Sequence, residues 1–244
     1  MANGTVDYYN KNAASFVEQT KNIDMSAIYK PFTSLLPTGG HVLDAGCGSG
    51  RDSLAFIKQG YKVTAIDASP EVAAIAEKLL GAPVVVRRLQ DICDVEQYHG
   101  IWACASLLHV PLTEISSTIE NLWYALKPGG AFYFSFRTGE GESDEDGRHF
   151  TNANDPLVRS WFKPLSDVEK LSFWITEDKR PGKSHIWLNC IARKTPAKLV
   201  TGGKDNPFLP HLCTSIHKAR KISMAVSFVK VSGLSLLMPD LRDA

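Results

Sequence analysis

From Val42 to Arg137, short apolar runs alternate with longer segments in which apolar residues recur every three or four positions. Apolar runs of about four to eight residues are typical of buried strands, and the longer spacing is typical of amphipathic helices. Strands separated by helices predict βαβ units and a parallel sheet that is covered on both faces. The expected strands are Val42–Ala45, Tyr61–Ile66, Pro83–Leu89, Gly100–Ser106 and Gly130–Arg137, and the expected helices between them are Ser53–Gln59, Pro70–Leu80 and Thr113–Leu126.

After Arg137 the pattern changes. Gly139–Arg148 is polar and acidic and predicts a solvated loop, and Pro156–Phe162 predicts a helix. Two longer apolar runs, Leu171–Glu177 and His185–Arg193, flank a Pro-Gly pair, which is typical of an antiparallel hairpin. Together the patterns predict an α/β fold with a doubly wound, mostly parallel seven-stranded sheet and a terminal antiparallel hairpin.

The net charge of the chain hides two unlike parts. The 244 residues contain 27 Lys+Arg and 26 Asp+Glu, a formal charge of +1. Residues 1–192 carry a net charge of −5 and residues 193–244 carry +6. We therefore expect a main domain of residues 1–195 and a short basic α/β appendage of residues 196–244. The two helices expected over the carboxyl ends of the strands, within residues 1–37, are Thr5–Gln19 and Ser26–Leu36.

Composition argues against several classes of protein. Hydrophobic residues make up 44% of the chain, yet no run of about 18 or more apolar residues could span a bilayer, so no membrane partner is expected. The five cysteines are odd in number and never spaced Cys-x-x-Cys, which argues against a disulfide framework and a metal site. The first residues lack the basic and apolar regions of a signal peptide, and we expect a cytoplasmic protein.

A glycine-rich loop joins the first expected strand to the first helix. Its sequence is Asp44-Ala45-Gly46-Cys47-Gly48-Ser49-Gly50, and glycines at alternate positions let the backbone turn sharply and approach a ligand closely. A dinucleotide fingerprint would need glycine where Arg51 stands, and the Gly-Lys-Ser/Thr of a P-loop is absent. Asp67, at the end of the second strand, can accept hydrogen bonds from the two hydroxyls of a ribose.

Four motifs in register resemble those of the class I S-adenosylmethionine-dependent methyltransferases. They are the glycine loop, Ala65-Ile66-Asp67-Ala68-Ser69-Pro70, Leu89-Gln90-Asp91-Ile92 and Leu126-Lys127-Pro128-Gly129-Gly130. The resemblance covers about residues 38–193, the terminal hairpin included. It implies a Rossmann-like methyltransferase fold, S-adenosyl-L-methionine as the cofactor, and methyl transfer as the activity.

Around the methionine part of this cofactor, the resemblance implies contacts from the glycine loop. The three glycines would pass under the methionine, and Asp44 would lie near its amino group. Arg51 either binds the cofactor carboxylate or is a solvated arginine in the first turn of the helix. Ser106, at the end of the fourth strand, would offer backbone atoms beside the methyl group, and Cys47 is filler in the loop rather than a nucleophile. The expected contacts of this part are Asp44, Gly46, Cys47, Gly48, Gly50, Arg51 and Ser106.

Around the nucleoside part, the resemblance implies contacts from two further motifs. Asp67 would hold the ribose, and Ala68 would pack on the adenine. Asp91 with Ile92 would meet the adenine edge. Two alternatives stay open, because Asp67 is also suited to cap a helix, and Asp91 is also suited to a turn with Asp94 in its place.

The segment after the fourth strand, Ala105–Pro111, bears on the acceptor. It lacks the Asn/Asp-Pro-Pro-aromatic motif of enzymes that methylate amino groups of nucleic acids, and it lacks a Pro-Cys pair for attack on a pyrimidine. His109 is the candidate catalytic residue, as a general base or substrate contact, because histidine titrates near neutrality; the alternative is a histidine packed before Pro111. Residues expected to close a substrate pocket, each with a structural role as the alternative, are Tyr8, Tyr9, Arg148 and Phe150.

The basic appendage resembles the opening of phospholipase-D-like domains of helicase-associated proteins. The His-x-Lys-x4-Asp motif of that family is absent, since His217 and Lys218 are adjacent. Residues 196–244 are therefore either a truncated module or an extension that packs on the main domain or dimerises. Their charge permits contact with nucleic acid, although this partner is not favoured.

The sequence therefore favours a methyltransferase with an unidentified acceptor, preferably a small molecule. One alternative is a non-catalytic cofactor-binding module that recruits a nucleic-acid-processing partner through the basic appendage. A second is an NAD-type oxidoreductase, which Arg51 and the terminal hairpin argue against. The sequence does not define the acceptor or the oligomeric state.

Overall fold

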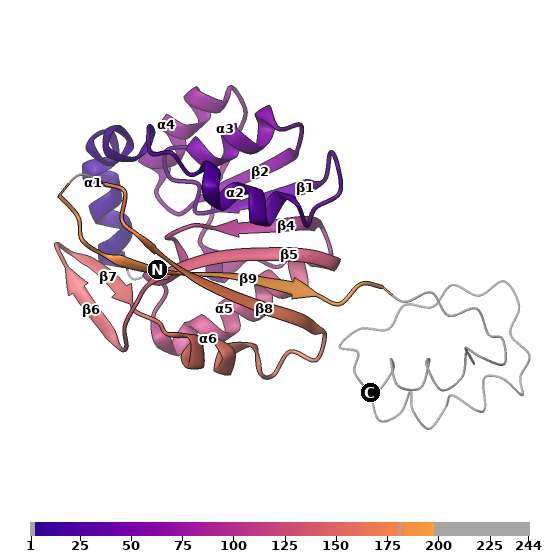
Figure 1. The fold of residues 1–244 in the computed structure, drawn as a ribbon. Helices are drawn as coiled ribbons and strands as arrows, with labels where there is room; N and C mark the ends of the chain where they lie inside the picture. The colour runs from indigo at the N-terminus through magenta and orange to yellow at the C-terminus, as the bar shows by residue number, and fades with distance from the viewer. Residues whose placement is uncertain (1–2, 181, 198–244) are drawn as a thin grey trace, which may run out of the picture. The chain divides into compact units, whose positions relative to one another are not determined.

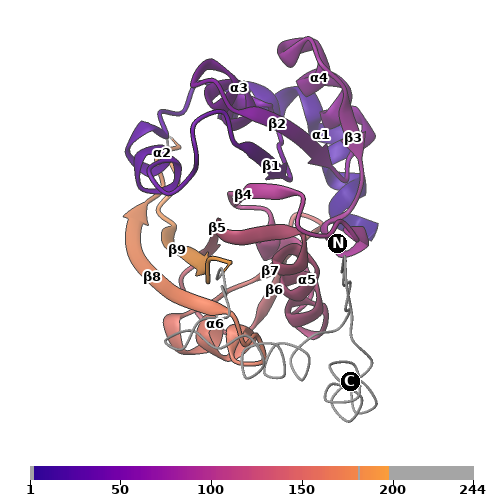
Figure 2. The same ribbon diagram turned by 90° about the vertical axis from the view of Figure 1, so that its right-hand side faces the viewer.

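One sheet of seven strands organises residues 3–180 and 182–197, the residues that the computed structural model describes (Figure 1). The strands are β1 (His41–Ala45), β2 (Lys62–Asp67), β3 (Val84–Val86), β4 (Tyr98–Ala103), β5 (Leu126–Arg137), β8 (Val168–Glu177) and β9 (Ile186–Lys194). Their order is β3-β2-β1-β4-β5-β9-β8, which confirms the predicted doubly wound sheet with a terminal hairpin. Strands β1 to β5 pair in parallel, whereas β9 pairs antiparallel with both β5 and β8. Figure 2 shows β3 and β8 at opposite edges of the sheet.

Helices cover both faces of the sheet. The α-helices of the described residues are α1 (Asn3–Thr20), α2 (Ser26–Thr33), α3 (Arg51–Lys58), α4 (Pro70–Leu80), α5 (Leu112–Ala125) and α6 (Asp155–Phe162). Helices α5 and α6 lie on one face, and α2, α3 and α4 lie on the other (Figure 1). Helix α1 packs against α4. Ser69 caps α4 by accepting a hydrogen bond from the backbone N–H of Val72, and Gly81 ends the helix in the left-handed region.

Alternate residues of the central strands pack on opposite faces of the sheet. Leu43 of β1 and Phe134 of β5 belong to the buried cluster beneath α5 and α6. Val42 and Tyr133, one position away in each strand, belong to the cluster beneath α2 and α3, where Tyr133 stacks on Trp102 with ring centroids 3.9 Å apart. Burial on both faces explains why these strands read as continuous apolar runs. The sheet is therefore a rigid support for the loops at its carboxyl ends.

Two boundaries differ from the prediction and matter for the loops at the carboxyl ends. β4 ends at Ala103, because Ala105 adopts a left-handed conformation with φ 51°. Ser106 therefore lies in the connection to the 3₁₀-helix η2 (Leu107–His109) instead of ending the strand. β3 likewise ends early, and a second 3₁₀-helix, η1 (Leu89–Asp91), follows it.

The acidic segment after β5 is a hairpin, so its prediction as a loop is wrong, although its acids are exposed to solvent as predicted. Strand β6 (Glu142–Glu145) pairs antiparallel with β7 (Arg148–Thr151), so that basic residues of β7 lie opposite acids of β6. Asp146 and Gly147 connect the strands with φ values of 52° and 80°. Positive φ at both positions is typical of a type I′ turn, for which Asp-Gly is a favoured sequence. The turn and the opposite charges explain why an acidic run forms strands.

The predictions for the C-terminal part fall on residues that the structure does not describe. The appendage of residues 196–244, with its phospholipase-D-like resemblance, lies outside the described residues apart from its first two positions and stays a prediction. Within residues 3–180 and 182–197, no helix combines the length and the apolar character that crossing a bilayer requires.

Candidate active site

A cavity of about 220 Å³ lies at the carboxyl ends of the central strands, where α1 and the glycine loop meet. Its wall also includes residues of α2 and of the β8–β9 connection. The predicted site residues that line it are Tyr9, Gly46, Cys47, Gly48, Arg51, Asp67, Ser106, His109, Arg148 and Phe150. The predicted site residues outside this lining are Tyr8, Asp44, Gly50, Ala68, Asp91 and Ile92.

The glycine loop is held tightly against its surroundings. Gly46 has φ +85°, and a Cβ atom at this position would lie 2.5 Å from the Cβ of Ser106. The backbone N–H groups of Gly46 and Cys47 both donate to the carbonyl oxygen of Ile66, at 3.0 and 2.8 Å. Burial raises the pKa of the Cys47 thiol well above its usual value, so the thiol is protonated at neutral pH, consistent with filler rather than a nucleophile. Position 46 thus accepts only glycine without strain.

Asp67 presents a carboxylate at the cavity wall without a basic partner among the described residues. One oxygen accepts a hydrogen bond from the N–H of Gly48, and the other accepts from the N–H of Ser69, both at 2.9 Å. Burial raises the pKa of Asp67, and these N–H groups oppose the shift. A carboxylate can accept about four hydrogen bonds, and the backbone N–H of Ala68 also favours its ionised form, so at least one acceptor position remains for a ligand hydroxyl. The residues present therefore fit a ribose, and Asp67 also orders the loop before α4.

Two further acids lie behind the glycine loop. Asp44 is buried and accepts a hydrogen bond from the Ser53 hydroxyl at 2.6 Å. Burial, and next the nearby charge of Asp52, raise the pKa of Asp44 to about 8. Asp52 accepts hydrogen bonds from the Tyr29 hydroxyl at 2.6 Å and from the Trp102 indole at 2.8 Å, and it lines the cavity. Asp52 was not among the predicted residues, and its contacts come from elements far apart in the sequence.

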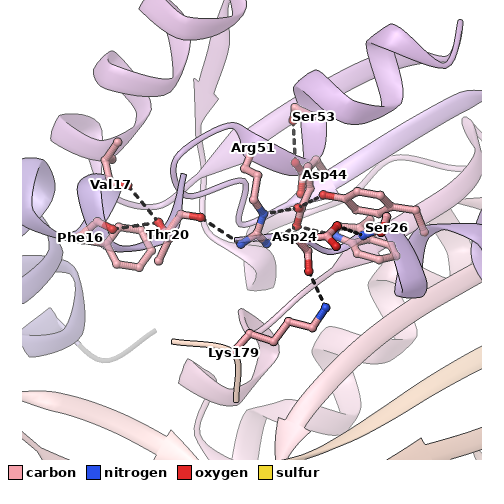
Figure 3. Close-up of polar contacts among 12 residues, drawn as sticks. Phe16, Val17, Thr20, Asp24, Ser26, Asp44, Arg51, Ser53 and Lys179 are labelled. Carbon is pink, nitrogen blue, oxygen red and sulfur yellow. Dashed lines mark hydrogen bonds and ion pairs between the residues drawn. The ribbon is translucent and has the colours of Figure 1, made fainter. Parts of the chain in front are cut away.

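Arg51 is engaged by protein groups on three of its nitrogens. Its Nε and Nη2 donate to the carboxylate of Asp52 at 2.6 and 2.9 Å, and its Nη1 donates to the carbonyl oxygen of Thr20 at 3.2 Å. Figure 3 shows Arg51 reaching from the start of α3 to the end of α1. In the same view, Lys179 donates to the carbonyl oxygen of Asp24 at 2.7 Å. These two contacts tie the segment between α1 and α2 to the rim of the cavity.

His109 forms a buried hydrogen-bonded chain with Tyr9. The Tyr9 hydroxyl lies 2.8 Å from Nε2 of His109, and Nδ1 lies 2.7 Å from the carbonyl oxygen of His149. Because a carbonyl only accepts, Nδ1 carries the proton, and Nε2 accepts from Tyr9. Burial lowers the pKa of His109 to about 3, which keeps the ring neutral at ordinary pH. The neutral ring therefore fixes the orientation of the Tyr9 hydroxyl.

Aromatic and basic side chains form the adjoining wall. The guanidinium of Arg137 lies 3.7 Å from the centre of the Phe150 ring, and that of Arg148 lies 5.1 Å from the same centre. Arg148 also lies 4.4 Å from the centre of the Tyr8 ring. Tyr8 thus supports Arg148 from outside the cavity. Arg137 was not among the predicted site residues. Its position at the end of an apolar strand could have indicated a residue of the site, because the carboxyl ends of the strands form the cavity.

The residues predicted at the adenine lie away from this cavity. The carboxylate of Asp91 accepts hydrogen bonds from Nε and Nη2 of Arg88 at 2.8 and 2.9 Å. Ile92 is 2% exposed and belongs to the core. Ala68 follows Asp67 and does not line the cavity. The adenine contacts of these residues stay predictions.

A polar group on the floor of the cavity was also missed. The Tyr133 hydroxyl donates to Oδ1 of Asn189 at 2.7 Å, and Nδ2 of Asn189 donates to the Thr176 hydroxyl at 2.9 Å. All three residues line the cavity. Pairing of β5, β8 and β9 brings them together, and no local sequence motif marks them.

Within the described ranges, no group of three or more His, Cys, Asp or Glu residues is placed to hold a metal ion.

The strand order and the terminal hairpin define the Rossmann-like fold of class I methyltransferases. Residues 42–130 match the family model described as "Methyltransferase domain". "Putative methyltransferase YqeM" of Bacillus subtilis is 26% identical over 156 residues, 57% of this chain and 62% of that protein. "Ubiquinone biosynthesis O-methyltransferase" of Xylella fastidiosa is 37% identical over 106 residues, 40% of this chain and 42% of that protein. The chain thus spans less than two thirds of the length of these curated relatives.

Solved structures share the fold at low sequence identity. The 1,6-didemethyltoxoflavin-N1-methyltransferase of Burkholderia thailandensis superposes with a TM-score of 0.62 at 22% identity, covering 78% of this chain and 85% of that one. A SAM-dependent methyltransferase of Methanosarcina mazei superposes with a TM-score of 0.61 at 19% identity, covering 72% of this chain and 100% of that one. These structures confirm the predicted fold for the main domain.

Proposed function

We propose that the chain is an S-adenosylmethionine-dependent methyltransferase whose acceptor is a small molecule. The observation that carries the proposal is the placement of Asp67, whose carboxylate is fixed by Gly48 and Ser69 beside the glycine loop at the cavity wall. The family match over residues 42–130 supports the same activity. An NAD-type oxidoreductase is disfavoured by that match and by the terminal hairpin.

Relatives support the cofactor and the kind of acceptor. The Burkholderia enzyme was solved with 1,6-didemethyltoxoflavin and S-adenosylhomocysteine bound, and the Xylella relative is named an O-methyltransferase of ubiquinone biosynthesis. For this chain, Gly46 and Gly48 would hold the methionine part, and Asp67 would hold the ribose. Arg51, which already donates to Asp52 and Thr20, would meet the cofactor carboxylate only by exchanging one of these partners. Ser106, whose hydroxyl donates to Ala45, keeps its backbone close to Gly46.

S-adenosylmethionine, when bound, supplies a methyl group on a positively charged sulfur. The residues of the cavity have two tasks in such an in-line transfer, alignment of the acceptor and exclusion of water. The Tyr9 hydroxyl donates a hydrogen bond to His109, and its oxygen, which Arg148 also approaches, keeps capacity to accept a hydrogen bond from an acceptor hydroxyl or amine. The low pKa of His109 makes it a weak base, and we infer that it acts by positioning Tyr9.

The partner and domain predictions remain proposals. The +6 charge of residues 193–244 is the basis for a nucleic-acid partner, and a cytoplasmic location rests on the sequence alone. The non-catalytic alternative would use the same cavity to bind cofactor without turnover. Transfer of labelled methyl groups by the full chain distinguishes these possibilities.

The experiment presents separate pools of small metabolites, RNA, DNA and protein to the full chain with methyl-labelled S-adenosylmethionine. We expect label in the small-molecule pool. Label confined to RNA or DNA would contradict the small-molecule acceptor. Binding of S-adenosylmethionine without label in any pool would favour the non-catalytic module.

A further inference from the structure

Among the residues that the structure describes, four arginines line the cavity, and they differ in their carboxylate partners. Arg51 is paired with Asp52, and Arg180 is paired with Asp178, whose side chain is 3% exposed. Each of these pairs shares two hydrogen bonds and places its carboxylate in the cavity wall. The positive charges of these two arginines are therefore balanced within the site.

For Arg137 and Arg148, no described residue supplies a buried carboxylate in the cavity wall. Arg137 is 8% exposed, and its Nη1 donates to Glu145, which lies outside the cavity lining with a side chain 44% exposed. Among the described residues, the carboxylate that Arg148 approaches is that of Asp146, at 3.4 Å, and that side chain is 78% exposed. Arg148 also contacts the Tyr9 hydroxyl, which is not charged at neutral pH. An exposed carboxylate compensates little of the cost of burying a guanidinium charge, because water screens the attraction between the two groups.

Arg137 and Arg148 also have N–H donors without a hydrogen-bond acceptor among the described residues. A guanidinium has five N–H donors. The buried Nε atoms of Arg137 and Arg148 have no hydrogen-bond partner among the described residues. A buried donor without a partner is costly, so this wall is built for an acceptor that the protein itself does not provide.

We infer that Arg137 and Arg148 form an anion subsite that binds a carboxylate of the methyl acceptor, an inference that rests on the proposed function. The guanidinium fork matches the geometry of a carboxylate, and the shared Phe150 ring holds both forks at the same wall. A monoanion suits the site better than a phosphate dianion, because Asp67 and Glu177 also line the cavity and would repel the second charge.

The subsite lies next to the residues that would align the transfer. Tyr9, His109 and Phe150 line the same part of the cavity as Arg148, and the charge of Arg148 lowers the pKa of Tyr9 against the larger effect of burial. Because Arg148 contacts the Tyr9 hydroxyl, an acceptor with its carboxylate on the two arginines would lie against Tyr9. The subsite therefore sets both the charge and the orientation of the acceptor.

Calorimetric titration with benzoate and with its uncharged analogue benzamide tests the subsite, using the full chain saturated with S-adenosylhomocysteine. We expect benzoate to bind at least about tenfold more tightly than benzamide, and Arg148→Gln to remove this preference. Arg137→Gln, checked for folding by circular dichroism, should do the same. Arg159→Gln is the matched control, because Arg159 is exposed and pairs with Asp155 on α6.

Three other results would contradict the inference, and a fourth would separate it from the proposed function. Equal binding of benzoate and benzamide would remove the anion subsite, and tighter binding of inorganic phosphate than of benzoate would reassign it to phosphate. Loss of S-adenosylhomocysteine affinity in Arg148→Gln, with benzoate binding unchanged, would assign Arg148 to the cofactor. Benzoate preference in a chain that does not bind S-adenosylhomocysteine would support the subsite and contradict the proposed function.

Discussion

The hydroxyl of Tyr9 donates a hydrogen bond to Nε2 of His109 at 2.8 Å, joining the first helix to the loop after β4 across 100 positions of sequence. The carbonyl oxygen of His149 accepts from the other ring nitrogen at 2.7 Å. His109 is 3% exposed, so water does not replace either partner. The tautomer of His109 and the direction of the Tyr9 proton are thereby fixed.

Tyr9→Phe should destabilise the protein by about 1–3 kcal/mol, because it leaves a buried acceptor on His109 without a donor. Tyr8→Phe is the control, since it keeps the ring that packs against Arg148 and should change the free energy of unfolding by less than about 0.5 kcal/mol. Urea denaturation at neutral pH measures both. Equal effects of the two substitutions would show that the Tyr9–His109 hydrogen bond contributes nothing of its own.

The buried ring should also make stability depend on pH. The pKa of His109 is lowered by burial from 6.5 to about 3. Between these values the unfolded chain binds a proton that the folded chain does not, so the free energy of unfolding falls as the pH falls from about 6.5 to about 3. His109→Gln should reduce the loss between about pH 7 and pH 5 by about 2 kcal/mol relative to the unsubstituted chain. An identical loss in both proteins would contradict a neutral buried His109.

Gly46→Ala should be more harmful than Gly60→Ala, although the two glycines have nearly equal φ values of +85° and +86°. The left-handed conformation alone costs an alanine about 1–2 kcal/mol at either position. At Gly46 the new Cβ would also lie 2.5 Å from Ser106, whereas at Gly60 nothing lies within 4 Å. Denaturation and S-adenosylhomocysteine titration of both variants check this. Equal destabilisation with full binding would show that the loop has room to move.

Much of the fold could be predicted from the sequence, because its central strands are buried on both faces and its helices are amphipathic. The alternation from Val42 to Arg137 reflects these two kinds of burial directly. The β6–β7 hairpin was missed because a run of acids suggested a loop, whereas exposed acids also fit a hairpin whose Asp146-Gly147 carried the turn signal. In this segment, the Asp-Gly turn sequence therefore predicts the secondary structure better than the acidic composition does.

The sequence predicted the site residues that belong to short motifs, and it missed those whose partners lie far away in the sequence. The glycine loop and Asp67 lie on neighbouring strand ends, and their hydrogen bond between Gly48 and Asp67 follows from the order of β1 and β2. Asp52 and Arg137 depend on partners in other elements, Trp102 and Glu145. Such contacts form only when the sheet brings the elements together, and no spacing in the sequence reveals them.

Asp67→Ala should weaken S-adenosylhomocysteine binding by roughly 1–3 kcal/mol, the scale of lost charge-assisted hydrogen bonds. Asp67→Asn should fall between alanine and the unsubstituted chain, because the amide oxygen still accepts one hydrogen bond. Asp155→Ala is the control, since Asp155 pairs with Arg159 outside the cavity and its loss should leave affinity unchanged. Unchanged affinity in Asp67→Ala would refute its role at the ribose.

Calorimetric titration of the full chain with S-adenosylhomocysteine and, separately, with NAD tests the central claim most directly. A cavity built from the glycine loop and Asp67 for S-adenosylmethionine should bind S-adenosylhomocysteine at a single site and show no heat of binding with NAD. Clear binding of NAD, with no binding of S-adenosylhomocysteine, would contradict the assignment as a methyltransferase.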